Sequence, residues 1–416
     1  MKRKFTNLII VAAFFIVTNA DSQTAYITDF TGNCVYVIDV TTSTVIDTIA
    51  VGSGPFGVSV SPDGTRVYIT NQNSGTVSVI NTANDSVVAT IPLGSGLYGI
   101  AVSPDGTKVY AARNNQVDVI NTATNIVTAT INLIFGPLEG IAISHDGSKV
   151  YAACNSLYPI IYVINTANNA VLDTIHFSVG YNPYGCAISP DDRKLYVTEN
   201  GGYNTFIINT VTDSIIDTII VGEEPQAICV SPDGSRIYVA AFQEGYVSVI
   251  DSLSNHVIGD ITICNTNGLP EGISISPDGT KLYTTASATN PCNTVTIYNT
   301  VTSAVNIITI GNELVSFGNF ISTHTAITTG LASKHKESPS ISIYPNPAST
   351  LLNIHQSSPS PNQQLIITDL LGTEVYKEML TGIDNTITIS SWCAGVYFYE
   401  VRGANETARG KFVKMN

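Results

Sequence analysis

The sequence predicts an all-β protein in which a closed ring of four-stranded sheets is followed by a smaller all-β domain. The tetrapeptide Ser-Pro-Asp-Gly begins at Ser61 and again at Ser103, so the repeat length is 103 − 61 = 42 residues. Within one repeat, short apolar runs alternate with clusters of Gly, Asn, Asp and Pro, which is typical of strands joined by tight turns. No helical spacing of apolar residues competes with this pattern.

The first complete repeat contains four apolar runs, each of which predicts a strand: Val67–Ile69, Val77–Ile80, Val87–Leu93 and Gly99–Val102. In the turn before them, Pro62 presets its own φ and Gly64 accepts a positive φ, as a hairpin connection requires. The apolar residues occupy successive positions, so both faces of each sheet need cover. Stacking one sheet against the next provides that cover.

Two strand types recur seven times each, which predicts a complete ring of seven sheets. The Gly-led strands are Gly57–Ser61, Gly99–Ser103, Gly140–Ser144, Gly185–Ser189, Ala227–Ser231, Gly272–Ser276 and Gly318–Ser322. The Tyr-led strands begin at Tyr26, Tyr68, Tyr110, Tyr151, Tyr196, Tyr238 and Tyr283. The chain starts with a Tyr-led strand and finishes with a Gly-led strand. The last inner strand must therefore join the first three strands in one shared sheet, which leaves no edge open.

The Tyr-led strands carry a recognisable tetrapeptide. Tyr68-Ile69-Thr70-Asn71 and Tyr196-Val197-Thr198-Glu199 each follow a Ser-Pro-Asp-type turn and precede another apolar strand. In this respect residues 24–323 resemble the YVTN family of β-propeller repeats, known from surface-layer and other secreted proteins. The resemblance implies a seven-bladed β-propeller.

The N-terminus has the layout of a cleavable secretory signal, which we place at residues 1–23. Lys2, Arg3 and Lys4 precede an apolar run over residues 8–17, and small and polar residues follow it. The apolar run is too short to span a membrane comfortably. No later segment reaches 18 unbroken apolar residues, so we expect an exported protein with no transmembrane segment after signal removal.

A second domain is predicted at residues 341–416, after a polar linker at residues 324–340. Its alternating strands suit a small β-sandwich. Its motifs resemble the C-terminal sorting domain of the type IX secretion system of Bacteroidota-type bacteria. The residues that carry this resemblance include Tyr344, Pro345, Asn346, Pro347, Gly372, Gly395, Lys411 and Lys414. The resemblance implies engagement with that secretion machinery and delivery to the outer-membrane surface or the medium of a Gram-negative cell.

Charge and motif content exclude several classes of function. Residues 24–323 contain 24 acidic and 8 basic side chains, a net charge of 8 − 24 = −16, which disfavours nucleic-acid binding. The GxGxxG matches at 52–57 and 94–99 open strands rather than helices, so we interpret them as turns between blades and not as dinucleotide sites. No catalytic motif, metal-ligand spacing or cofactor signature is found, and the protein is not expected to be an enzyme.

The best candidates for a ligand site come from propeller geometry. Loops that follow the Tyr-led strands and loops that enter the inner strands meet at one mouth of the central channel. Aromatic and charged residues at these positions could hold a polar ligand or a cation: Tyr98, Arg113, Glu139, Tyr184, Glu199 and Glu271.

We therefore expect an exported binding or scaffold module for an extracellular protein or glycan. Two alternatives remain open. One is a lactonase-like hydrolase with a metal at the channel mouth, because some propellers that resemble this one open lactone rings with acidic residues and a metal. The other is a structural surface-layer subunit. Fold alone does not decide between them.

Seven cysteines occur without any CxxC pair. Cys264 and Cys292 fall in loops expected on the same propeller face, so we predict a disulfide between them that closes a 29-residue loop, counted as 292 − 264 + 1. Export permits such a bond. Cys186 and Cys229 lie within inner strands and are expected to be small buried free thiols.

Overall fold

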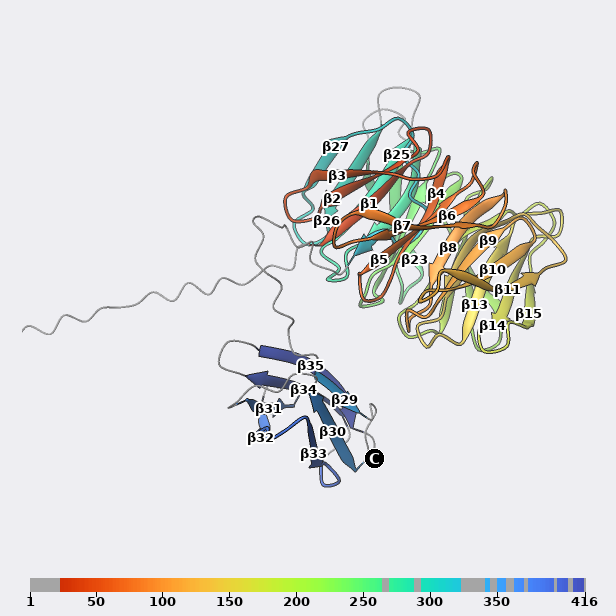
Figure 1. The fold of residues 1–416 in the computed structure, drawn as a ribbon. Coiled ribbons are helices and arrows are strands. Elements are labelled where there is room, and N and C mark those ends of the chain that lie inside the picture. The colour runs from red at the N-terminus through yellow and green to blue at the C-terminus, as the bar shows by residue number, and fades with distance from the viewer. Residues whose placement is uncertain are drawn as a thin grey trace, which may run out of the picture. The chain divides into compact units, whose positions relative to one another are not determined.

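The computed structural model describes residues 23–263, 269–287, 293–322, 341–344, 350–356, 363–369, 373–392, 395–402 and 407–414. The chain divides into two compact units, Met1–Thr328 and Thr329–Asn416. Each unit is all-β in its described part (Figure 1). Among the described residues, no helix is long and apolar enough to cross a membrane. Cys264 and Cys292 lie outside the described residues, so their disulfide stays a prediction.

The first unit consists of seven four-stranded antiparallel sheets, the blades of a propeller. The innermost strands are β4 (Pro55–Val60), β8 (Leu97–Val102), β12 (Leu138–Ile143), β16 (Pro183–Ile188), β20 (Pro225–Val230), β24 (Leu269–Ile275) and β28 (Ile321–Ser322). The second strands are β1 (Thr24–Asp29), β5 (Arg66–Asn71), β9 (Lys108–Arg113), β13 (Lys149–Cys154), β17 (Lys194–Glu199), β21 (Arg236–Ala241) and β25 (Lys281–Ser287). The third strands are β2 (Cys34–Asp39), β6 (Thr76–Asn81), β10 (Gln116–Asn121), β14 (Ile160–Asn165), β18 (Asn204–Asn209), β22 (Tyr246–Asp251) and β26 (Thr294–Asn299). The outermost strands are β3 (Thr44–Ala50), β7 (Ser86–Pro92), β11 (Ile126–Asn132), β15 (Val171–His176), β19 (Ser214–Ile220), β23 (His256–Thr262) and β27 (Val305–Thr309).

The ring closes as the sequence predicts, through a sheet shared by both ends of the propeller. The strand order of that sheet is β28-β1-β2-β3, with Ala25 opposite Ile321. The Tyr26 N–H donates to the Phe320 carbonyl at 2.9 Å. The segment that leads into the last inner strand also meets the first inner strand, because the Val58 N–H donates to the Phe317 carbonyl at 2.9 Å. The seven-bladed architecture with a three-plus-one seam is therefore confirmed.

The Ser-Pro-Asp-Gly turn is a self-contained hydrogen-bonded unit. Ser61 Oγ donates to Asp63 Oδ1 at 2.6 Å and accepts the Arg66 N–H at 2.9 Å. Gly64 has φ +69°, a conformation that a side chain would strain. Serine and aspartate supply the side-chain bonds of the turn and glycine suits its positive φ, although Asp192 adopts φ +59° at the equivalent position. These local requirements explain why the motif recurs from blade to blade.

Glycine and threonine join neighbouring blades around the axis. A Cβ on Gly57 would lie 2.3 Å from the Tyr98 carbonyl oxygen of the next blade, so only glycine permits this approach. Thr70 Oγ1 donates to that same carbonyl at 2.7 Å and accepts the Gly57 N–H at 2.8 Å. The threonine of the Tyr-led strand therefore fastens its own inner strand to the following blade.

Lysines at the start of the second strands also join neighbouring blades, at the end of each blade that carries the Ser-Pro-Asp-type turns. Lys108 Nζ donates to the Thr166 carbonyl of the next blade at 2.7 Å, and Lys149 Nζ donates to the Thr210 carbonyl, also at 2.7 Å. Lys281 makes the equivalent bond across the seam, to the Val40 carbonyl. Each stem packs along the blade while its ammonium group satisfies a turn carbonyl.

The second unit is a sandwich of two sheets. One sheet has the order β29-β30-β33 and the other has the order β32-β31-β34-β35. Their bounds are β29 (Ile341–Tyr344), β30 (Leu351–Gln356), β31 (Gln364–Thr368), β32 (Glu374–Met379), β33 (Asp384–Thr388), β34 (Gly395–Arg402) and β35 (Thr407–Lys414). Leu352 and Ile354 of one sheet share a buried core with Leu365 and Ile367 of the other.

Candidate functional site in the central channel

The residue before each inner-strand glycine is set apart by a β-bulge. The pairing of β4 with β5 shifts register between Pro55 and Val58, and the pairing of β8 with β9 shifts between Leu97 and Ile100. The pairings of β12, β16, β20 and β24 with their second strands show the same shift of register near the start of the inner strand. Bulges re-aim side chains next to functional sites.

Residues at this position come together around the propeller axis. We define the mouth cluster by its six aromatic and acidic members: Phe56, Tyr98, Glu139, Tyr184, Glu271 and Phe317. The ring centroids of Phe56 and Tyr98 are 5.4 Å apart, and those of Tyr184 and Phe317 are also 5.4 Å apart, both pairs in edge-to-face geometry. Phe56 and Phe317 complete the chain of rings at 5.8 Å. Four predicted site residues, Tyr98, Glu139, Tyr184 and Glu271, are thus placed in one cluster.

The two carboxyl groups of the mouth cluster are in an unusual environment. Glu139 is 6% exposed, and its Oε2 is buried with no hydrogen-bond partner among the described residues. Burial raises the pKa of Glu139 to about 8. Burial likewise raises the pKa of Glu271 to about 7, although Ser287 Oγ donates a hydrogen bond to Glu271 Oε1. Tyr184 lies near both groups, since burial and then Glu139 and Glu271 raise its pKa well above the usual range.

The structure places Arg113 and Glu199 in the turns of their own blades instead of in the mouth cluster. Arg113 Nε pairs with Asp118 Oδ2 at 3.0 Å, across the hairpin from β9 to β10. Glu199 Oε2 accepts a hydrogen bond from Asn204 at 2.6 Å and lies against Gly202 in the turn between β17 and β18. Both residues end second strands, opposite Leu97 and Pro183, which precede two cluster positions. Their side chains close the hairpins of their own blades, and their role in a ligand site stays a prediction.

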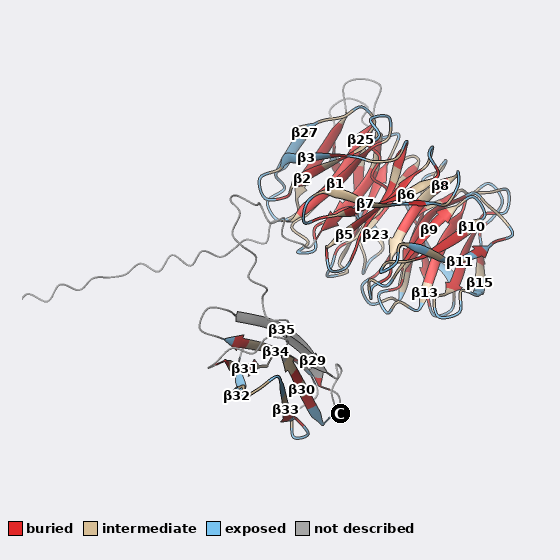
Figure 2. Ribbon diagram, in the orientation of Figure 1, coloured by how far each residue is buried: buried red, intermediate tan, exposed pale blue. Residues whose placement is uncertain are grey.

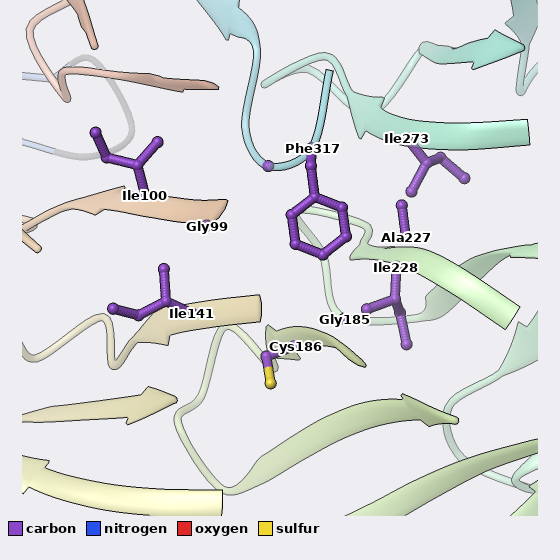
Figure 3. Close-up of a pocket in the computed structure, with 10 residues that line it drawn as sticks. Gly99, Ile100, Ile141, Gly185, Cys186, Ala227, Ile228, Ile273 and Phe317 are labelled. Atoms are coloured by element: carbon purple, nitrogen blue, oxygen red, sulfur yellow. The ribbon is translucent and has the colours of Figure 1, made fainter. Parts of the chain in front are cut away.

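Beyond the mouth cluster the channel narrows. A cavity of about 30 Å³, enough for about one water molecule, is lined by Ile100, Ile141, Cys186, Ile228, Ile273 and Phe317. Figure 3 shows these side chains on successive inner strands, with the Phe317 ring among them. The mouth cluster and this constriction lie toward the beginning of the inner strands.

The opposite end of the channel opens into a wide funnel, which the sequence analysis missed. Its volume is about 650 Å³. The wall is formed by the last residues of the inner strands, which include Val60, Val102, Ile143, Ile188, Val230 and Ile275. The rim is formed by the second residues of the Ser-Pro-Asp-type turns, Pro62, Pro104, His145, Pro190, Pro232 and Pro277. The one available signal was the repeated proline, which we had assigned to turn formation alone.

Cys186 and Cys229 also line this funnel. Both are free and only half-buried, rather than buried as expected, because the inner strands turn one face toward the open channel. Burial of the sulfur raises the pKa of Cys186 to about 12, so the thiol stays protonated at neutral pH. No group of three or more His, Cys, Asp and Glu side chains suited to a metal ion occurs in the described part of the chain.

The predicted sorting residues fall in the second unit. Tyr344 ends β29, Gly395 begins β34, and Lys411 and Lys414 lie in β35. Pro345, Asn346, Pro347 and Gly372 lie outside the described residues.

Residues 342–415 match the family described as the secretion system C-terminal sorting domain. Residues 10–158 match a family described as a domain of unknown function, DUF5074. The seven-bladed beta-propeller protein Rv1057 of Mycobacterium tuberculosis (strain ATCC 25618 / H37Rv) is 34% identical over 112 residues, which are 26% of this chain and 28% of that protein. The match therefore spans little more than a quarter of the relative's length.

Two solved structures resemble the propeller. Kuenenia stuttgartiensis hydrazine synthase aligns with a TM-score of 0.59 and 21% identity, over 69% of this chain and 92% of that chain. A functionally unknown protein from Desulfotomaculum acetoxidans DSM 771 aligns with a TM-score of 0.60 and 17% identity, over 71% of this chain and 99% of that chain. At such identities the likeness shows the fold alone. Sheet order, closure and these similarities together make the chain a seven-bladed β-propeller protein with a C-terminal secretion-system sorting domain.

Proposed function

We propose that this exported propeller is a binding module that holds a basic, apolar-tipped segment of another extracellular protein in its funnel. The observation that carries the proposal is the open funnel itself. Its volume of about 650 Å³ falls within the range of about 300–1,000 Å³ that is typical of ligand sites. Its aliphatic wall suits an apolar side chain.

The charge of the rim favours a cationic partner. The six turns at 62–65, 104–107, 145–148, 190–193, 232–235 and 277–280 together contain seven aspartates and one arginine. Asp233 shows how this charge is maintained. Ser231 Oγ donates to it at 2.6 Å and the Ser235 N–H donates at 3.0 Å, and these bonds lower its pKa to about 2. The rim is therefore a ring of ionised carboxylates around an apolar opening, which attracts positive charge.

The nearby lysines do not neutralise this ring by pairing with its aspartates. Lys108 and Lys194 donate to carbonyl oxygens in the turns of neighbouring blades, and Lys149 adds an ion pair with Asp213 at 3.0 Å. These cations are committed to blade contacts.

Export supports an extracellular partner. The sorting domain implies engagement with the type IX secretion machinery and a cell-surface or secreted location. We place the protein on the outer-membrane surface, with the propeller presented to proteins of the medium or of the same surface.

The test is peptide binding to the full chain, followed by fluorescence polarisation. The probes are a labelled nonapeptide with one phenylalanine between lysine pairs, the same peptide with glutamates in place of the lysines, and a neutral oligosaccharide. We expect the basic peptide alone to bind. Because salt screens surface charges, its affinity should fall by about tenfold or more between about 50 and about 300 mM salt.

Matched variants locate the site. Ala187 lines the funnel, so Ala187→Trp should fill it and lower affinity for the basic peptide at least about tenfold, the loss of about 1.4 kcal/mol. Ala167→Trp, in an exposed turn between β14 and β15, is the control and should leave affinity unchanged. Equal binding of the acidic peptide or the oligosaccharide, or full affinity in the Ala187 variant, would contradict the proposal.

A lactonase-like hydrolase is the second candidate, because Glu139 and Glu271 bring two carboxyl groups of raised pKa to the channel mouth. Such groups are candidates for acid or base catalysis. A calcium titration of the full chain followed by melting temperature distinguishes the two ideas. A saturable rise that Glu139→Gln and Glu271→Gln abolish would favour the hydrolase.

A structural surface subunit is favoured by a separate observation. The outermost strands expose aliphatic side chains on every blade. In Figure 2 the ribbons of β11 and β27 are largely coloured as exposed. Examples are Ile46, Val88, Ile126, Leu172, Ile216, Ile258 and Val305. Exposed apolar edge strands are prone to associate. Concentration-dependent assembly in sedimentation velocity experiments would favour this role over a monomeric binding module.

A further inference from the structure

A second site is suggested by the side chains that plug the other end of the channel. Buried carboxyl groups are normally paired with a cation or hydrogen-bonded, because leaving one unpaired costs free energy. Glu139 departs from this rule, since it is 6% exposed and its Oε2 has no partner within the described residues. The group most able to complete this environment is a positive charge that comes from outside the chain.

We infer that the mouth cluster binds a small organic ammonium ion, held between its aromatic rings and the carboxylates of Glu139 and Glu271. Four rings form one connected group through ring contacts, and cations are attracted to aromatic faces within about 6 Å of the ring centroid. Tyr98 and Tyr184 flank Glu139 in the circular order of the blades, and each feels its charge. Phe56 and Phe317 connect these two tyrosines through ring contacts.

No cation of the described propeller occupies this role. Arg113, the one basic residue among the predicted site residues, is paired with the buried Asp118 at 3.0 Å. The other ion pairs of the described propeller are made by His145, Lys149 and Arg236, and they involve neither Glu139 nor Glu271. The mouth cluster thus combines two acidic groups with no internal counter-charge.

The chemistry of the cluster favours an organic cation over a metal ion. Calcium takes about six to eight oxygen ligands and magnesium needs a near-ideal octahedron of oxygens. Here most of the ring around the axis is aromatic, and aromatic faces bind ammonium groups that carry methyl or methylene substituents. A primary amine or a quaternary ammonium group fits both the rings and the carboxylates.

Proton linkage provides a distinctive signature. The titratable groups that face Glu139 are Tyr98 and Tyr184 of the neighbouring inner strands and Cys154 of β13. Each of these is neutral near pH 7, because burial raises its pKa, so the protons released when a cation binds come from Glu139 and from Glu271. Affinity should therefore rise with pH, by at least about tenfold per unit below the pKa of about 8.

The experiment is calorimetric titration of the full chain with choline, tetramethylammonium and 3,3-dimethylbutanol, the neutral analogue of choline. We expect both cations to bind, the neutral analogue to bind at least about tenfold more weakly, and binding at pH 7 to release protons, detected in buffers of different ionisation enthalpy. Glu139→Gln should lower affinity for choline about tenfold or more and weaken its pH dependence, leaving the part that comes from Glu271. Glu244→Gln, in an exposed turn, is the matched control.

A second pair of variants keeps the test decisive if the first changes the fold. Glu271→Gln and Tyr184→Leu should each weaken choline binding, with circular dichroism showing that the sheets persist. Equal affinity for choline and its neutral analogue, no proton release, or undiminished binding in all three cluster variants would overturn the inference. Tight binding of calcium in place of the ammonium ions would do so too. Peptide binding in the funnel is measured in a separate experiment. A negative result with choline therefore leaves the proposed peptide binding untouched, and a negative result with the peptide leaves the ammonium site untouched.

Discussion

The pKa of Glu139 makes a prediction about the stability of the propeller. Burial raises this pKa from 4.5 to about 8, so the folded protein keeps a proton that the unfolded chain has already lost in this interval. The contribution of Glu139 to stability is therefore fully present below pH 4.5 and is lost as pH rises toward 8. Glu271, with its pKa raised to about 7, acts in the same direction. We expect Glu139→Gln to remove the larger part of this loss.

The size of the effect follows from the shift. Each unit of pKa difference corresponds to about 1.4 kcal/mol, so a rise from 4.5 to about 8 gives up to about 5 kcal/mol. Glutamine has the same shape but cannot ionise, and its unpaired amide lowers stability by about 1–3 kcal/mol at every pH. The expected result is a variant that is less stable than the parent at pH 5 and equal to it or more stable at pH 8.5.

Urea unfolding between pH 5 and 8.5 measures this, with far-ultraviolet circular dichroism reporting mainly on the propeller. Trp392 is the single tryptophan of the chain and packs against Tyr397 in the second unit, at 5.1 Å between ring centroids. Its fluorescence follows the second unit in the same samples and serves as an internal control. Glu244→Gln, which is exposed, should keep the parental pH dependence. If Glu139→Gln loses as much stability as the parent between these pH values, the burial argument is refuted.

Three other predictions concern the repeat and the tail. Thr70→Val removes the hydroxyl that pairs the Gly57 N–H and the Tyr98 carbonyl, and it should lower the free energy of unfolding in urea by about 1–3 kcal/mol. Thr90→Val, on an exposed outer strand, is the control and should change that free energy little. The pKa of Asp233, lowered to about 2, contributes stability that is present above pH 4 and is lost as pH falls from 4 to 2. The free energy of unfolding of Asp233→Asn should therefore depend less on pH in this interval than that of the parent. Deleting 341–416 should leave the propeller folded but retained in the periplasm, and surface labelling of the truncated protein would contradict this.

Much of the fold could be predicted from the sequence because its recurring residues have local causes. Ser61 and Asp63 build a turn from their own hydrogen bonds, and Gly57 permits an approach that any Cβ would block. Such requirements act on neighbouring residues, so they are visible as a repeat. Counting Gly-led and Tyr-led strands was then enough to predict both the number of blades and the closure.

The site was predicted less completely, because it depends on where a strand aims its side chains. The bulge before each inner-strand glycine brings Glu139 and Tyr184 to the axis, whereas the last residue of a second strand closes its hairpin, as Glu199 does with Asn204. Both positions lie within one or two residues of a strand end, and both include acidic residues. Nothing in composition or spacing distinguishes them. The funnel was missed for a related reason, since its wall consists of aliphatic residues that a sequence assigns to the core.

A comparison of the seven repeats distinguishes positions that hold the blades together from positions that are candidates for ligand binding. Positions that join blades are nearly uniform: glycine begins six of the seven inner strands, and the Tyr-led strand has tyrosine in every copy. The position just before that glycine varies freely between Phe, Tyr, Glu and Gln, although every copy aims at the same axis. A ring built only for stability would repeat one side chain there as it does elsewhere. Two acids remain at this position although burial raises their pKa at a cost to folding, and this variation supports the ammonium site that we infer above.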